Sequence, residues 1–149
     1  MTTLKAGDKA PNFSGLDQDG NKIALDNFKG KKLVVFFYPK ASTPGCTAEA
    51  CNLRDNYQTF QAQGYEIIGV SADSAKRQQN FKNKYELPYP LIADEDKAVI
   101  EAFGVWGPKK FMGKEYDGIH RTTFVIDENG IISEVITKVK TKEHAAQIL

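Results

Sequence analysis

Runs of hydrophobic residues divide the first half of the chain into alternating strands and helices. Residues 33–38 form an unbroken apolar, β-rich run, which is typical of a strand buried on both faces of a sheet. Residues 66–72 repeat this pattern. Between them, apolar residues of 46–63 recur every three or four positions, and Gly64 follows where a helix would end. The pattern predicts a β-α-β unit with one long, half-buried helix.

The remaining segments continue this alternation at shorter lengths. Asp19-Gly20 lies between two short apolar segments and predicts an N-terminal hairpin with a two-residue turn. The further predicted elements are helices at 74–85, 97–103 and 142–149 and strands at 90–93, 122–127 and 131–137, the last entered through the Asn129-Gly130 turn. Together they predict one α/β domain over residues 1–149, with three layers, a mixed sheet and an N-terminal β-hairpin.

Charge and composition exclude several classes of function. The 149 residues carry a formal net charge of only +1, with no dense basic run interleaved with aromatic residues, which argues against nucleic-acid binding. The longest apolar run is far shorter than the ~20 residues that span a bilayer, so no membrane association is expected. Because the first residues lack the apolar core of a signal peptide, we expect the protein in the cytoplasm. Two cysteines in such a reducing compartment indicate catalysis, redox sensing or metal binding.

Cys46 lies where chemistry is expected, between the C-terminal end of a predicted central strand and a helix start. Thr43 is a good N-cap and Pro44 suits the first helical position, so Cys46 falls in the first turn. There the free backbone N–H groups and the helix dipole favour a thiolate over a thiol. The alternative is a buried apolar cysteine with no chemical role.

Cys51 follows five residues later, at a spacing that an intact helix does not allow for a disulfide. On a regular helix the two Cα atoms would be about 8.7 Å apart and about 140° around the axis, whereas a disulfide needs less than about 7 Å. If Cys46 and Cys51 pair, the helix start must unwind. Otherwise Cys51 is a small residue on another helix face. A closed zinc site needs four ligands, and only His120 and His144 could join the cysteines, so we expect no metal.

Arg121 directly precedes the apolar strand predicted at 122–127. Its planar guanidinium is therefore placed at a strand end, where it either turns toward a neighbouring thiolate or remains a surface charge. The sequence alone leaves both open.

The run 38–47, Tyr-Pro-Lys-Ala-Ser-Thr-Pro-Gly-Cys-Thr, resembles the active-site segment of peroxiredoxins, which share the pattern Pro-x-x-x-Thr-x-x-Cys. With a second cysteine five residues on, it is similar to the Q-type branch, also called bacterioferritin comigratory protein. The segments 104–107 and 113–127 look like later parts of that branch. The resemblance therefore covers nearly the whole chain.

This resemblance implies a thioredoxin-like fold with an N-terminal extension and a role for each site residue. Cys46 would be the peroxidatic cysteine and Cys51 the resolving one. The residues implied to shield the thiolate, stabilise it and orient the peroxide are Pro39, Thr43, Arg121 and the backbone N–H groups of Gly45 and Cys46.

The implied activity is the reduction of hydrogen peroxide and organic hydroperoxides through a Cys46 sulfenic acid. Cys51 would close an intramolecular disulfide that thioredoxin or a similar dithiol reduces again, with no cofactor, in a monomer. Two alternatives stay open. A general dithiol oxidoreductase usually carries Cys-x-x-Cys, which this chain lacks. A peroxide sensor or partner-binding module would keep the fold without turnover.

Overall fold

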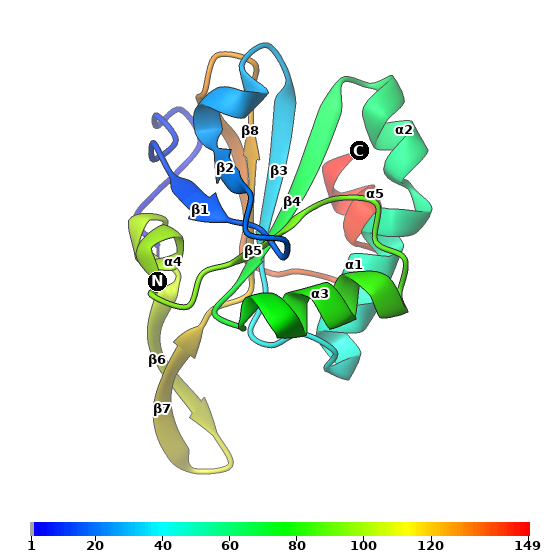
Figure 1. The fold of residues 1–149 in the computed structure, drawn as a ribbon. Coiled ribbons are helices and arrows are strands. Elements are labelled where there is room, and N and C mark those ends of the chain that lie inside the picture. Colours follow the sequence, from blue (N-terminus) through cyan, green and yellow to red (C-terminus); the bar gives the residue numbers. More distant parts are fainter. Residues whose placement is uncertain (1) are drawn as a thin grey trace.

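The computed structural model describes residues 2–149 and contains a central five-stranded sheet of order β5-β4-β3-β8-β9 (Figure 1). Its strands are β3 (Lys32–Phe37), β4 (Tyr65–Ser71), β5 (Leu91–Ala93), β8 (Thr122–Ile126) and β9 (Ile132–Ile136). The first three run parallel, whereas β8 is antiparallel to β3 and β9 to β8. The predicted mixed sheet is confirmed.

Alternating residues of β3 supply two separate cores. Leu33, Val35 and Phe37 point into one core and Val34 and Phe36 into the other, and all five are fully buried. This is the period-two pattern of a strand covered on both faces, which explains its unbroken apolar run.

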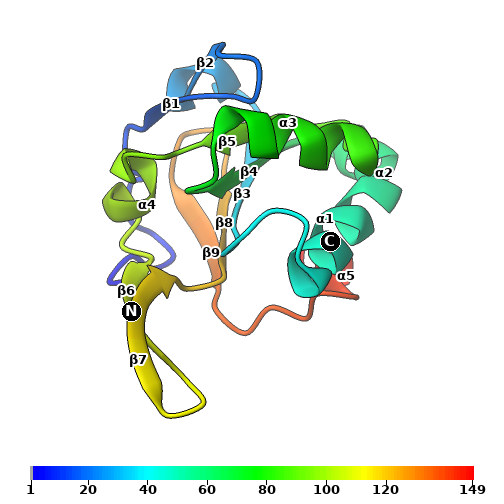
Figure 2. The ribbon, with the colours of Figure 1, turned by 60° about the horizontal axis from the view of Figure 1, so that its bottom comes forward.

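Helices cover one face of the sheet, and a smaller group of elements covers the other (Figures 1 and 2). The first group consists of α1 (Pro44–Asp55), α2 (Tyr57–Ala62), α3 (Ala75–Lys84) and α5 (His144–Ile148). The second consists of β1 (Ser14–Leu16), β2 (Lys22–Ala24), the 3-10 helix η1 (Leu25–Phe28) and α4 (Ala98–Ala102). The three layers are therefore as predicted, and apart from the helix at 46–63 the predicted elements end within two residues of the observed ones. Within residues 2–149, no helix is long and apolar enough to span a bilayer.

The N-terminal hairpin is confirmed, but its turn is longer than predicted. β1 and β2 pair antiparallel with Leu16 opposite Lys22, so the loop contains five residues rather than two. Its first residue, Asp17, accepts hydrogen bonds from the backbone N–H groups of Asp19 and Asn21, each at 2.9 Å. This carboxylate organises the loop in place of a tight two-residue turn.

The prediction of one continuous helix over 46–63 is wrong, because the chain breaks between α1 and α2 at Asn56. The Asn56 side chain donates to the carbonyl of Asn52 at 2.8 Å, which is the acceptor that its own backbone N–H would use in a helix. That N–H turns to Leu53 instead. A local side-chain hydrogen bond has replaced one backbone hydrogen bond of the helix.

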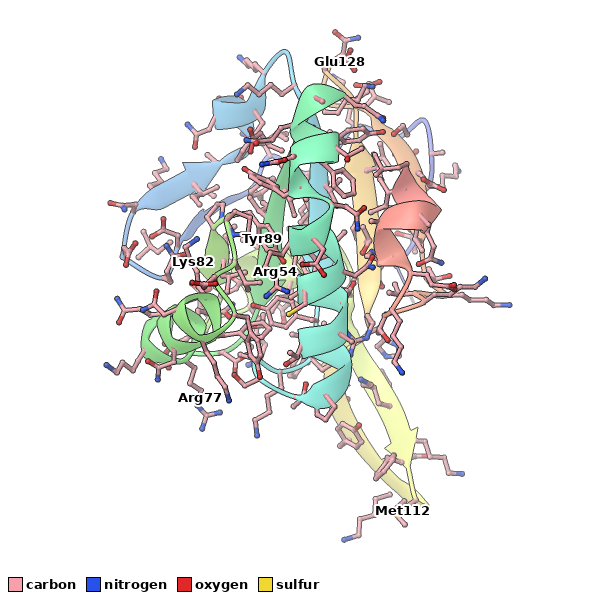
Figure 3. All side chains as sticks on the ribbon, turned by 90° about the vertical axis from the view of Figure 1, so that its right-hand side faces the viewer. Arg54, Arg77, Lys82, Tyr89, Met112 and Glu128 are labelled. Atoms are coloured by element: carbon pink, nitrogen blue, oxygen red, sulfur yellow. The ribbon has the colours of Figure 1, made fainter. Side chains whose placement is uncertain are left out.

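A second hairpin, β6 (Trp106–Phe111) and β7 (Lys114–Ile119), was not predicted and projects away from the sheet (Figure 2). It turns at Met112-Gly113, and both residues have positive φ, 52° and 80°, as a tight two-residue turn requires. Met112 lies at the exposed tip (Figure 3). Because little of the protein covers these two strands, their residues do not alternate between apolar and polar as in a half-buried sheet. The hydrophobic pattern therefore did not indicate this hairpin.

The side chains packed beneath α3 leave no room for a methyl group at Gly69 in β4, so adding one should lower the stability of the fold. A Cβ there would lie 2.8 Å from Leu91 and 2.9 Å from Phe36, inside van der Waals contact with two buried side chains. We expect Gly69→Ala to lower the free energy of unfolding by about 1–3 kcal/mol in urea denaturation. In Gly118→Ala, the nearest atom belongs to the flexible Lys109 side chain. This control should change stability by less than about 0.5 kcal/mol. Equal effects would contradict the packing argument.

Candidate active site

The loop between β3 and α1 is fixed by a buried carboxylate. Asp73, just beyond β4, accepts the backbone N–H of Ala41 and the hydroxyl of Ser71, both at 2.7 Å. Ser42 then has a φ of 64°, a left-handed conformation that reverses the chain toward the helix. Pro39 lies at the start of this loop and is half-buried. Asp73 could not be predicted as part of this loop, since it reaches the loop from the end of the neighbouring strand.

The helix α1 begins where the sequence predicted. Thr43 is the N-cap with extended backbone, Pro44 is the first helical residue and Cys46 the third. The first backbone N–H groups of this turn have no carbonyl of an earlier helical turn to bind, and Cys46 lies in the same turn. The Thr43 hydroxyl does not cap the helix. It donates to the carbonyl of Lys40 at 2.8 Å, and its proton is therefore not available to the thiolate.

Arg121 turns inward rather than remaining a surface charge. It directly precedes β8, and its Nη2 lies 3.3 Å from Sγ of Cys46, whose side chain is only 1% exposed. Gly45 makes room for this approach, because a Cβ there would lie 3.3 Å from the same nitrogen. The arrangement places a permanent cation beside a buried thiol at a helix N-terminus.

Glu49 holds the other side of the same guanidinium. Its Oε1 accepts from Nη1 of Arg121 at 2.6 Å, and its side chain is fully buried. Burial raises the pKa of Glu49 to about 7, although Arg121 acts in the opposite direction. Glu49 is not among the predicted site residues, although its position three residues after Cys46, on the same helix face, indicates it.

His144 of α5 completes the cluster and had no indication in the sequence. Its ring is fully buried, and Nε2 lies 3.4 Å from Oε2 of Glu49 and 2.7 Å from the hydroxyl of Thr123. The other histidine, His120, contacts the carbonyl of Pro108. Within residues 2–149, no three His, Cys, Asp or Glu side chains converge as metal ligands.

Cys51 lies on the intact part of α1, and both cysteines are free thiols. Burial raises the pKa of the Cys51 thiol. Two contacts hold this part of α1 from opposite sides. Asn52 donates to the Lys142 carbonyl at 3.0 Å and accepts the N–H of Ala145 at 2.7 Å, which ties α1 to α5. Tyr89 donates to the carbonyl of Ala50 at 2.7 Å from the side of α3 (Figure 3).

A buried thiol in the first turn of a helix, beside an arginine and at the C-terminal end of a parallel strand, defines a thiol-based redox enzyme. Known proteins identify the family. Residues 6–135 match the model of the AhpC/TSA family. Peroxiredoxin Bcp of Escherichia coli K12 is 49% identical over 149 residues, which cover 100% of this chain and 96% of that protein.

Solved structures agree with this match. A variant of PrxQ from Xylella fastidiosa has a TM-score of 0.92 at 28% identity, covering 99% of this chain and 94% of the other. The bacterioferritin comigratory protein of Xanthomonas campestris, described with alkyl peroxide reduction activity, has a TM-score of 0.88 at 35% identity, with coverages of 93% and 87%. The chain belongs to the AhpC/TSA family, in its peroxiredoxin branch of Bcp and PrxQ proteins. It is a thiol peroxidase with the thioredoxin-like fold that the sequence predicted.

The raised pKa of Glu49 predicts a specific pH dependence of stability. Between its ordinary value of 4.5 and about 7, the folded chain keeps a proton that the unfolded chain has lost. The stabilisation is complete below pH 4.5 and disappears as the pH rises through 7. It amounts to about 3 kcal/mol, at about 1.4 kcal/mol per pKa unit.

Glu49→Gln removes this slope because the amide does not titrate. The measurement is urea denaturation of both proteins across this pH range, and the difference between the two curves reports the proton of Glu49 together with its contact to His144. Parallel stability curves for the two proteins would show that Glu49 is ionised throughout.

Proposed function

We propose that Cys46 is the peroxidatic residue of this peroxidase. Its thiolate attacks one peroxide oxygen, the O–O bond breaks, and the sulfur loses two electrons to become a sulfenic acid. The other oxygen leaves with a proton as water or an alcohol. The observation that carries this proposal is the 3.3 Å contact between Cys46 Sγ and the Arg121 guanidinium in the first turn of α1.

Arg121 and the backbone N–H groups of Gly45 and Cys46 stabilise the thiolate and the charge that develops on the leaving oxygen. Thr43 orients the peroxide but does not stabilise the thiolate, which is a smaller role than the resemblance implied. Since its proton is held by the Lys40 carbonyl, its oxygen accepts a hydrogen bond from the O–H of the hydroperoxide and orients it. Pro39, at the start of the loop, shields the thiolate from water.

Cys51 then resolves the sulfenic acid by condensing with it, which releases water and forms an intramolecular disulfide. Because both cysteines lie on one intact helix, α1 must unwind first and break the Asn52 contacts with α5. An external dithiol protein, for which we propose thioredoxin, restores both thiols by exchange. This cycle requires a reducing compartment such as the cytoplasm.

We assign the cycle to one domain over residues 1–149, acting as a monomer, because both cysteines belong to the same helix and no second copy is needed. The substrates are hydrogen peroxide and organic hydroperoxides. The relative from Xanthomonas campestris, described with alkyl peroxide reduction, supports the second class.

One equivalent of hydrogen peroxide tests the two cysteine roles. We expect the wild-type chain to lose about 2 Da and both free thiols, since a disulfide forms with loss of two hydrogens. Cys51→Ser should stop at a sulfenic acid or an intermolecular disulfide, and Cys46→Ser should not react. Intact mass and thiol counting distinguish these products. Rapid peroxide consumption by Cys46→Ser would defeat the assignment, and a chain that reacts once without being reduced by thioredoxin would be a sensor.

The hydrogen bonds of Asn52, which join α1 to α5, predict a variant with faster disulfide formation. Asn52→Ala removes two hydrogen bonds that the unwinding helix must otherwise break, each worth about 1 kcal/mol. We therefore expect the step from sulfenic acid to disulfide to accelerate several-fold, with less overoxidation at high peroxide. Stopped-flow tryptophan fluorescence measures the step. Gln58→Ala, an exposed change on α2, is the control. An unchanged rate in Asn52→Ala would mean that α5 does not restrain the opening.

A further inference from the structure

Behind Arg121 lies a buried polar cluster that the proposed cycle does not use. Glu49 of α1 and His144 of α5 are both fully buried, with Oε2 of the carboxyl group 3.4 Å from Nε2 of the ring. The Thr123 hydroxyl lies 2.7 Å from the same ring nitrogen. The C-terminal helix thus contacts the partner of Arg121 directly.

Hydrogen bonds around Gln147 determine which ring nitrogen of His144 carries a proton. The amide nitrogen of Gln147 donates to the Lys138 carbonyl at 3.0 Å, and its oxygen accepts the N–H of Lys140 at 2.9 Å. That oxygen lies 2.7 Å from Nδ1 of His144. Because it is an acceptor, Nδ1 must be the donor. In the neutral ring, Nε2 therefore presents a lone pair.

This lone pair faces Glu49, and two acceptors at 3.4 Å repel each other in a buried site. The Thr123 hydroxyl can donate to Nε2, but Oε2 of Glu49 then has no hydrogen-bond partner within residues 2–149. One proton between Oε2 and Nε2 removes the conflict. Burial places this proton on the carboxyl group, because it raises the pKa of Glu49 to about 7 and lowers the pKa of His144.

The charges around the cluster show why this proton matters for the sulfur. Arg121 contacts both Glu49 and Cys46, and Lys109 of β6 is a second cation near the thiol and Arg121. Tyr89, also near Glu49, stays neutral because burial raises its pKa well above the ordinary value. With Glu49 ionised, two anions share one guanidinium. With Glu49 neutral, the guanidinium pairs with the thiolate alone.

We propose that His144 is a positioning residue of the peroxidatic site, which holds one proton against Glu49 and so leaves the charge of Arg121 to the Cys46 thiolate. The inference rests on the proposed role of Cys46. It assigns the C-terminal helix a part in the chemistry, through a side chain that never touches the substrate.

The test follows thiolate absorbance against pH in a Cys51→Ser background, where Cys46 is the remaining thiol. In His144→Phe we expect the midpoint of this titration to rise by about one pH unit, equivalent to a tenfold smaller thiolate fraction below the midpoint. At pH values below the midpoint, the reaction with hydrogen peroxide should slow by about the same factor. Adding Glu49→Gln to His144→Phe should restore both, because the amide mimics the protonated acid.

A matched control separates this effect from mere loosening of α5. Asn52→Ala removes the hydrogen bonds of Asn52 to Lys142 and Ala145, which join α1 to α5, without touching Glu49, so its midpoint should stay unchanged. The proposal fails if His144→Phe leaves the midpoint unmoved, if Asn52→Ala moves it equally, or if Glu49→Gln gives no rescue.

Should His144→Phe not fold, Glu49→Gln alone carries the test. It must keep the midpoint at or below that of the parent, and a rise would overturn the proposal. The titration measures the charge of the Cys46 sulfur and does not depend on catalytic turnover. Failure of the proposed function, seen as peroxide reduction by Cys46→Ser, is therefore a separate result.

Discussion

The guanidinium of Arg121 is the contact on which the rest of the site depends. One of its nitrogens lies 3.3 Å from Cys46 Sγ and another 2.6 Å from Glu49 Oε1. A buried charge is costly unless it is paired, so the guanidinium makes a negative charge on either neighbour tolerable. Both partners lie on one face of α1, one turn apart, and a single side chain from the sheet thereby fixes the rotation of the helix.

The register of the sheet explains why Arg121 arrives at this place. β3 and β8 pair antiparallel with Phe37 opposite Thr122, so the residue after one and the residue before the other leave the sheet at the same edge. Beyond Phe37 the chain leads into α1, and before Thr122 stands Arg121. A slip of one residue would turn Arg121 toward the opposite face of the sheet. The strong burial of both strands excludes that slip, which means that the hydrophobic core indirectly positions the cation.

Interactions between residues close in sequence made much of this site predictable. The site residues that were missed reach it through long-range contacts. The N-cap position of Thr43, proline in the first turn and the third-position Cys46 are decided within a few residues. The structure has these positions as expected, although the Thr43 hydroxyl bonds the Lys40 carbonyl and not the helix. The break at Asn56 was missed because a side-chain amide competes with the backbone, which hydrophobic periodicity does not register. His144 could not be found, since only folding brings the end of the chain to α1.

In the proposed cycle, the same helix holds the thiolate in place and later unwinds, and its contacts are compatible with both. The break at Asn56 separates α1 from α2, so α1 can open while Phe60 of α2 keeps its place in the core. Oxidation itself weakens the first turn. A sulfenic acid carries no charge where the thiolate was an anion, so Arg121 and the N–H groups of the helix start lose the partner that favoured the folded turn. In the proposed cycle, the chemistry thus removes one restraint on α1 when Cys51 has to reach Cys46, and the contacts of Asn52 with α5 and of Tyr89 with Ala50 remain to be broken.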